Sequence, residues 1–119
     1  MAEHNDLGKL GEEMAIEYLQ KNGYEILATN WVYQKAEIDI IARAGGVVAV
    51  VEVKTRSSGE FGLPQEFVGQ KKIRLLLKAV DEYMQVYDME EEVRFDIVAV
   101  SKNAHGFEIE HLKDAFYHF

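Results

Sequence analysis

The sequence predicts an α/β fold in which helices flank a central mixed sheet. Two segments carry apolar residues at helical spacing, one over residues 6–20 and one running from Pro64 to Met84. Apolar and β-branched segments lie between and after them, which gives the order helix, three strands, helix, strand and a final strand. Because the second helix is a crossover between two strands, we expect those strands to be parallel and the sheet to be mixed.

The helix ends are indicated by capping residues and by proline. The first helix is expected over residues 6–20, since Asn5 or Asp6 can cap its start and Gly23 follows its end. Pro64 suits the first turn of the second helix, where the N–H that proline lacks has no partner within the helix. The strands are bounded by turn residues and are expected over residues 24–32, 37–43, 47–54, 94–101 and 107–112.

Length and composition favour one soluble domain spanning residues 1–119. A chain of 119 residues with 48% hydrophobic and 29% charged residues is long enough for one core but not for two. The longest apolar run, residues 47–51, is too short to span a bilayer, and the N-terminus lacks the apolar region of a signal peptide. With no cysteine, disulfides and thiolate metal sites are excluded. A cytoplasmic protein without membrane association is therefore expected.

The charge is unevenly distributed along the chain. A net charge of −8 argues against a protein that coats nucleic acid indiscriminately. Residues 54–78 nevertheless hold six basic residues and two acidic ones, which gives this segment a charge of +4. The segment indicates a localised anion-binding surface, and a solvated helix face is the alternative. The histidines show no paired ligand spacing and are expected at the surface.

Four charged residues interrupt the two strands on either side of Gly45-Gly46. If these glycines form a two-residue hairpin turn, Asp39 lies opposite Glu52, and Glu37 lies opposite Lys54. Side chains alternate along a strand, so Asp39, Glu52 and Lys54 share one face of the sheet. The other face is expected to form the core through Val47, Ala49, Val51, Val53, Ile38 and Ile40.

Two carboxylates that face each other across a strand pair repel and destabilise the sheet. A divalent cation between Asp39 and Glu52 would reverse that effect, because Mg²⁺ is held in proteins by one or two carboxylates together with water and substrate oxygens. Lys54 would add a positive charge for a phosphate or an attacking hydroxide. The alternative is an ion-paired cluster of the three side chains with a purely structural role.

These residues resemble the D…ExK core of the PD-(D/E)xK nuclease superfamily. The sequence is more similar to the YraN-like family of that superfamily, which also resembles archaeal Holliday-junction resolvases. The likeness extends over nearly the whole chain and departs at Ile38, where the superfamily has proline, and at Ala36, where the family usually has glycine. It rests on Gly11-Glu12, Asn30-Trp31, Glu37-Ile38-Asp39, residues 51–56, Phe61-Gly62, Lys71 and Arg94-Phe95-Asp96.

The resemblance implies a restriction-endonuclease-like α-β-β-β-α-β core and a set of site residues. Asp39, Glu52 and the backbone carbonyl of Val53 would bind Mg²⁺, for which Mn²⁺ can substitute. Lys54 would orient or activate the attacking water, and Glu12 would stand at the edge of the catalytic site, unless it is only a capped or ion-paired helix acid. Supporting roles fall to Glu37 and Gln70, and nucleic-acid contacts to Arg56, Lys71, Lys72 and Arg74.

The activity implied is that of a Mg²⁺-dependent endodeoxyribonuclease. Its substrate would be DNA, including branched intermediates of recombination or repair, and the sequence leaves open whether it acts as a homodimer. One alternative is a catalytically silent nuclease-fold module that binds DNA or a protein. Another is a protein-interaction module whose acidic surface includes residues 90–92.

Overall fold

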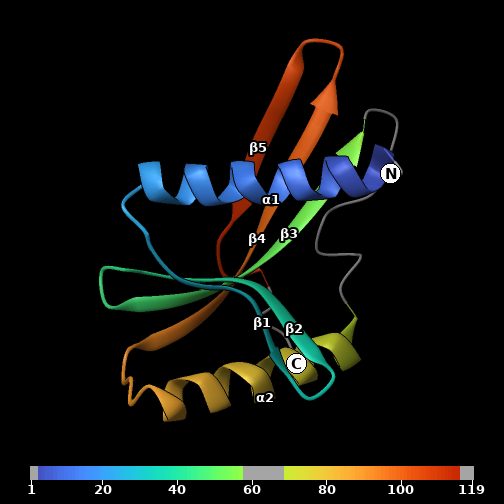
Figure 1. The fold of residues 1–119 in the computed structure, drawn as a ribbon. Coiled ribbons are helices and arrows are strands. Elements are labelled where there is room, and N and C mark those ends of the chain that lie inside the picture. Colours follow the sequence, from blue (N-terminus) through green and yellow to red (C-terminus); the bar gives the residue numbers. More distant parts are fainter. Residues whose placement is uncertain (1–2, 58–68, 116–119) are drawn as a thin grey trace.

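The structure, a computed structural model, describes residues 3–57 and 69–115. It is a mixed α/β fold with a five-stranded sheet and two helices, as the sequence predicts (Figure 1). Pro64, the predicted start of the second helix, and Phe61-Gly62 lie outside the described residues. The elements are α1 (Glu3–Lys21), β1 (Glu25–Tyr33), β2 (Ala36–Ala44), β3 (Val47–Ser57), α2 (Gln70–Val86), β4 (Glu92–Asn103) and β5 (Gly106–Leu112).

The sheet follows chain order, β1-β2-β3-β4-β5, with one parallel pair. β3 and β4 run parallel because α2 connects them as a crossover, and the other neighbours are antiparallel. Gly45 and Gly46 both have positive φ, at 55° and 78°, which suits the tight turn between β2 and β3. Ala44 pairs with Val47 as expected, so the predicted hairpin register is confirmed from this pair as far as Ile40–Val51.

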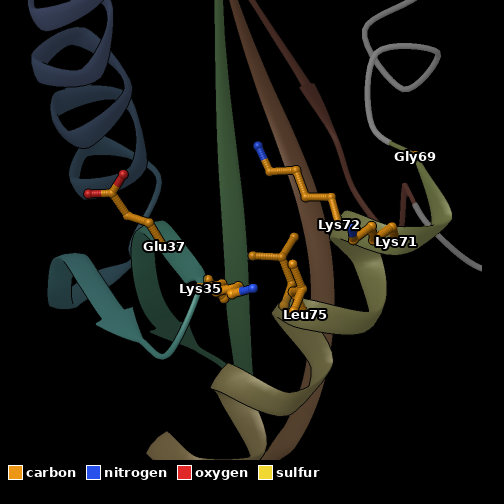
Figure 2. Close-up of a pocket in the computed structure, with 8 residues that line it drawn as sticks. Lys35, Glu37, Gly69, Lys71, Lys72 and Leu75 are labelled. Carbon is orange, nitrogen blue, oxygen red and sulfur yellow. The ribbon is translucent and has the colours of Figure 1, made fainter.

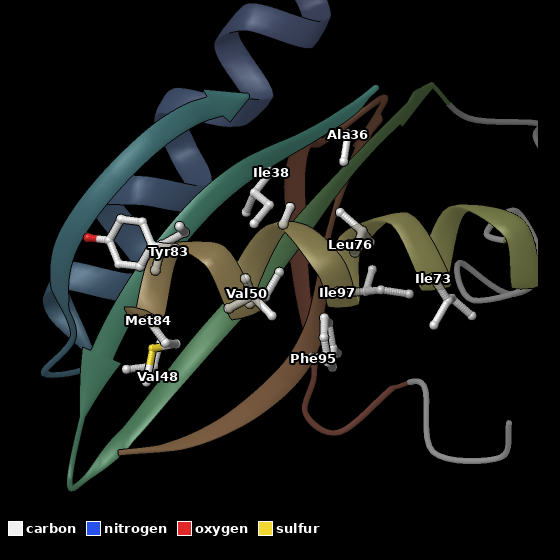
Figure 3. Close-up of a cluster of buried hydrophobic side chains, with 13 residues drawn as sticks. Ala36, Ile38, Val48, Val50, Ile73, Leu76, Tyr83, Met84, Phe95 and Ile97 are labelled. Carbon is white, nitrogen blue, oxygen red and sulfur yellow. The ribbon is translucent and has the colours of Figure 1, made fainter. Parts of the chain in front are cut away.

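The two helices cover opposite faces of the sheet (Figures 1 and 3). On the α2 face, Ile38 packs with Val48 and Val50, whereas on the α1 face Ile40 packs with Ala49. The expectation that one face of the hairpin forms the core, with Ile38 and Ile40 together, is therefore wrong. The alternation breaks at position 39, because the β1–β2 ladder passes from Thr29–Ile40 to Trp31–Ile38 without a pair between them.

α1 lies close against β3 because Gly11 has no side chain. A Cβ atom at this position would clash with the side chain of Thr55. Any larger residue would push the helix away from the sheet, so this contact fixes the height of α1 above β3. Glu12, the next residue, is thereby held over the sheet.

A buried polar network joins β4 to β5 and α1. Asp96 is 0% exposed and accepts hydrogen bonds from Arg94 and from Nε2 of His111 at 2.8 Å. Arg94 also donates to the Tyr24 hydroxyl, and His111 contacts the Tyr18 hydroxyl through its other ring nitrogen. Burial alone would raise the pKa of Asp96, but these hydrogen bonds outweigh it and lower the pKa to about 2. The prediction of a surface position for His111 is therefore wrong.

Candidate functional site

The candidate site lies where β2 and β3 separate. Their ladder ends at the pair Ile40–Val51, while β3 continues beside β4 as far as Ser57. The ladder therefore contains neither of the two predicted pairs, Asp39 with Glu52 and Glu37 with Lys54, so these predictions of direct pairing are wrong. Glu37 pairs with Val32 on the β1 side. The sheet twists, and β2 stays with β1 after it has left β3. The edge of β3 beyond Val51 is therefore not covered by β2.

Asp39 bridges this gap with its side chain. Its Oδ2 atom accepts a hydrogen bond from the backbone N–H of Val53 at 2.9 Å, which replaces the strand partner that β2 no longer provides. The N–H and C=O of one strand residue point to the same side, so the Val53 carbonyl faces the same open edge as the Asp39 carboxylate. The two oxygen donors expected at positions 39 and 53 are thus brought together.

Glu52 is the buried acid of the site, with 5% of its surface exposed. It lies on the α2 face, as alternation from Val48 and Val50 requires. Its Oε2 atom forms ion pairs with two ammonium groups, Lys54 at 3.6 Å and Lys72 from α2. The first of these pairs belongs to the alternative that the sequence leaves open, an ion-paired cluster, whereas the sequence assigns Lys72 only to nucleic-acid contacts.

The two carboxylates resist ionising together. Burial raises the pKa of Asp39 first, and the nearby charge of Glu52 raises it further, so that it reaches about 7. Glu12 adds to the increase, whereas the hydrogen bond from Val53 and the charge of Lys72 oppose it. Asp39 therefore ionises much less readily than an exposed aspartate. A cation at this position would favour its ionised form.

Glu12 approaches the site from α1 and is fixed by Asn30. The Asn30 side chain donates a hydrogen bond to Oε1 of Glu12 at 2.7 Å. Asn30 has a φ of 51°, an uncommon conformation that asparagine tolerates better than most residues, and it lies opposite Asp39 where the ladder is interrupted. The charge of Glu12 contributes to the raised pKa of Asp39, so the two acids lie within electrostatic range of each other.

The basic residues predicted for nucleic-acid contacts divide into two groups. Lys71 and Arg74 are exposed on the first turns of α2, and Arg56 is partly exposed on β3. Gln70, for which the resemblance implies a supporting role, is exposed beside Lys71. Lys72 turns to the sheet instead. It lies three and four residues before Leu75 and Leu76, which pack toward the core, and this helical spacing is the signal that places its stem on the inner side of α2.

The donor set consists of hard oxygen atoms, which suits Mg²⁺ or Mn²⁺ better than softer metals. Over residues 3–57 and 69–115, no group of three or more His, Cys, Asp or Glu side chains has the arrangement of a metal site. Coordination here would therefore rely on two carboxylates, one backbone carbonyl, and oxygen atoms from water or substrate. Such an incomplete protein shell is typical of Mg²⁺ sites that act on phosphates.

The described part of the chain has no helix that is both long and apolar enough to cross a membrane.

A family model described as uncharacterised protein family UPF0102 matches residues 11–100. The chain is 61% identical to a UPF0102 protein of Flavobacterium psychrophilum and 56% identical to one of Christiangramia forsetii, each over the full length of both chains. It is 47% identical to one of Bacteroides fragilis, over 98% of this chain and 97% of the other. The chain belongs to the uncharacterised protein family UPF0102.

Proposed function

We propose that this protein is a Mg²⁺-dependent endonuclease that hydrolyses phosphodiester bonds in DNA, including branched intermediates of recombination or repair. Asp39, Glu52 and the Val53 carbonyl would hold the metal, and Lys54 would act beside it. Mn²⁺ would substitute for Mg²⁺. The resemblance of Asp39, Glu52 and Lys54 to the D…ExK core of the nuclease superfamily supports this assignment.

One observation supports the proposal more than any other. Burial and the nearby charge of Glu52 together raise the pKa of Asp39 to about 7, at the open edge of β3 where a backbone carbonyl is also available. Holding two acids together in a half-buried place costs stability. A divalent cation removes that cost. Metal binding therefore explains why the two acids are held together, which a purely structural role does not.

The residues around the two acids divide the remaining work. When bound, the metal polarises the phosphoryl oxygens and lowers the pKa of a coordinated water. Lys54, whose ammonium lies 3.6 Å from Glu52, supplies positive charge where the phosphoryl group gains negative charge. Glu12, which accepts a hydrogen bond from Asn30 and lies within electrostatic range of Asp39, would accept a proton from a water molecule at the edge of the site.

A panel of nucleic acids tests the proposal directly. Single-stranded, duplex, flap and four-way-junction DNA would each be incubated with the purified protein and Mg²⁺ or Mn²⁺. We expect cleavage of at least one of them that requires the metal and stops with EDTA. Absence of cleavage of all four with either metal would contradict the proposal.

Replacing Lys54 by Ala should lower the cleavage rate about 10²-fold, the scale of losing one electrostatic stabiliser of the transition state. Mn²⁺ binding should change little, because Lys54 is not a ligand. Calorimetric titration with Mn²⁺ alongside single-turnover cleavage would separate the two effects. Lys78→Ala, which removes a lysine from the exposed face of α2, is the control for charge. If Lys54→Ala abolishes Mn²⁺ binding, the lysine instead maintains the shape of the site.

A second candidate function follows from the ion pairs of Glu52. Two lysines already neutralise this buried acid, so the cluster can be stable without a metal. The protein would then be a catalytically silent module of nuclease-like fold that binds DNA or a protein. This second candidate function predicts that Asp39→Ala and Glu52→Ala leave DNA binding unchanged. It also predicts that Mn²⁺ has no effect on DNA binding.

A further inference from the structure

Lys72 contacts Glu52, the buried acid of the candidate metal site. Its ammonium makes the closest ion pair of Glu52, and it also lowers the pKa of Asp39, so it senses both acids. Lys54 is the other cation on Glu52, at 3.6 Å. Among the described residues, the two acids are therefore balanced by two lysines. Both ammonium groups contact the same oxygen, Oε2, so a metal that binds Glu52 through this oxygen must displace one of them.

The two lysines differ in how easily they can leave. The Lys54 side chain is 23% exposed and comes from β3, two residues from Glu52 on the same strand face. The Lys72 side chain is 44% exposed and comes from the first turn of α2. A lysine side chain that is nearly half exposed gains little from one ion pair, so exchanging one anion for another costs it little. Lys72 is therefore the exchangeable cation.

A basic pocket lies next to Lys72 and offers another anion a place to bind. It has a volume of about 490 Å³ and lies between the β1–β2 turn and the start of α2 (Figure 2). Its charged residues are Lys35, Glu37, Lys71 and Lys72, which give it a charge of +2. In Figure 2, Lys72 extends away from α2 toward the sheet, so its stem spans the distance between the pocket and Glu52.

The start of α2 reinforces this preference for anions. Gly69 is the N-cap and forms no side-chain cap hydrogen bond, and the first turn contains no acidic residue. The N–H groups at a helix start attract negative charge, and here they lie beside lysines and a cavity large enough for a nucleotide unit. The chemical group that fits is a phosphate.

We propose that Lys72 exchanges between Glu52 and a backbone phosphate of DNA bound in this pocket, so that DNA binding makes the Asp39–Glu52 site available to the metal. This inference rests on the proposed function. A phosphate in the pocket draws the Lys72 ammonium away from Glu52. Mg²⁺ can then take the place of that ammonium as the counter-ion of Glu52. Linkage makes the effect reciprocal: the metal must strengthen DNA binding by the same factor as DNA strengthens metal binding. The metal would then be held firmly only when substrate is present.

The first measurement is the Mn²⁺ affinity of the protein without nucleic acid, by isothermal titration calorimetry. Lys72→Met should bind Mn²⁺ at least about tenfold more tightly than the wild type, within the usual range of such couplings. Lys71→Met removes an equal charge from the same pocket without touching Glu52, and its affinity should stay within about threefold of the wild type, as expected for a weak, screened charge effect. Lys72→Arg keeps the charge and should bind as weakly as the wild type.

The second measurement is the affinity for a phosphorothioate duplex, which resists cleavage, with EDTA and with Mn²⁺ at equal ionic strength. Mn²⁺ should tighten binding by the wild type about tenfold or more, and this gain should disappear in Lys72→Met but persist in Lys71→Met. A parallel Mn²⁺ titration with inorganic phosphate identifies the source of the anion. If phosphate alone strengthens metal binding as much as the duplex does, the pocket recognises the free ion and the assignment to DNA is overturned.

The outcomes separate this inference from the proposed function. Equal Mn²⁺ affinity of the wild type and Lys72→Met, each with a normal thermal melt, would overturn the exchange and leave the metal centre standing. No Mn²⁺ binding by any variant, even with the duplex present, would overturn both.

Discussion

Replacement of Asp39 by Asn, or of Glu52 by Gln, is expected to lower DNA cleavage at least about 10³-fold while leaving the fold intact. Both substitutions keep the shape of the side chain, and an asparagine amide oxygen can still accept the hydrogen bond from Val53. Each substitution removes a charged metal ligand, and with it several kcal/mol of the stabilisation that the metal gives the transition state. About 1.4 kcal/mol of activation free energy corresponds to a tenfold change in rate. Single-turnover cleavage of the best substrate from the panel would measure the loss.

Asp81→Asn is the matched control for this experiment. Asp81 lies exposed on α2 and accepts a hydrogen bond from Gln85, so the same chemical change there should leave cleavage within about twofold, as for most surface substitutions. Circular dichroism and a thermal melt would verify folding of all three variants. Cleavage at the wild-type rate by both Asp39→Asn and Glu52→Gln would show that the reaction takes place elsewhere or comes from a contaminant.

The same Asp39→Asn variant should be more stable than the wild type in EDTA at pH 8, by a few kcal/mol. The pKa of Asp39 is raised from 3.8 to about 7 in the folded protein, first by burial and then by Glu52, and each unit corresponds to about 1.4 kcal/mol. Asparagine has no charge to desolvate and does not repel Glu52. A variant that loses activity while it gains stability is expected where function requires a strained site.

The pH dependence identifies the cause of this gain. Because the folded pKa lies above the unfolded one, the folded protein keeps a proton between about pH 4 and 7 that the unfolded chain has lost. The free energy of unfolding of the wild type should therefore fall as pH rises through this window and level off above about pH 7. Asp39→Asn should lack this component, so the two curves should converge toward the acidic end of the window. Urea denaturation at several pH values would measure it.

Mn²⁺ should narrow this difference in stability between Asp39→Asn and the wild type. At about one hundred times its Kd, a metal that binds only the folded state adds about 2.7 kcal/mol to the wild type. Asp39→Asn should lose most of this response, since one ligand charge is gone. If Asp39, Glu52 and Lys54 form only a structural ion-paired cluster, Asp39→Asn would instead destabilise the protein in EDTA. A wild-type melting temperature that ignores saturating Mn²⁺ would count against a metal centre in the free protein.

Local rules account for the parts of the fold that the sequence predicts. The pairing of Ala44 with Val47 depends on two adjacent glycines that both adopt positive φ, and alternation of side chains then carries the register as far as Ile40–Val51. The parallel pairing of β3 with β4 follows from the crossover that α2 makes between them. Each of these inferences needs only neighbouring residues or the order of elements, both of which can be read from the chain.

The contacts that complete the candidate site were decided by tertiary structure. The sequence cannot show that β2 leaves β3 after Ile40, because this depends on the twist accumulated over the whole sheet. Nor can it show that Asn30 reaches Glu12, or that His111 is buried against Asp96, since these partners are 18 and 15 residues apart and meet only after the helix and strands have packed. The sequence by itself determined which strands carry the two acids and Lys54. The packing of α2 across the sheet decided that Lys72 lies on Glu52, because a helix fixes which of its side chains face inward only once it has a surface to pack against.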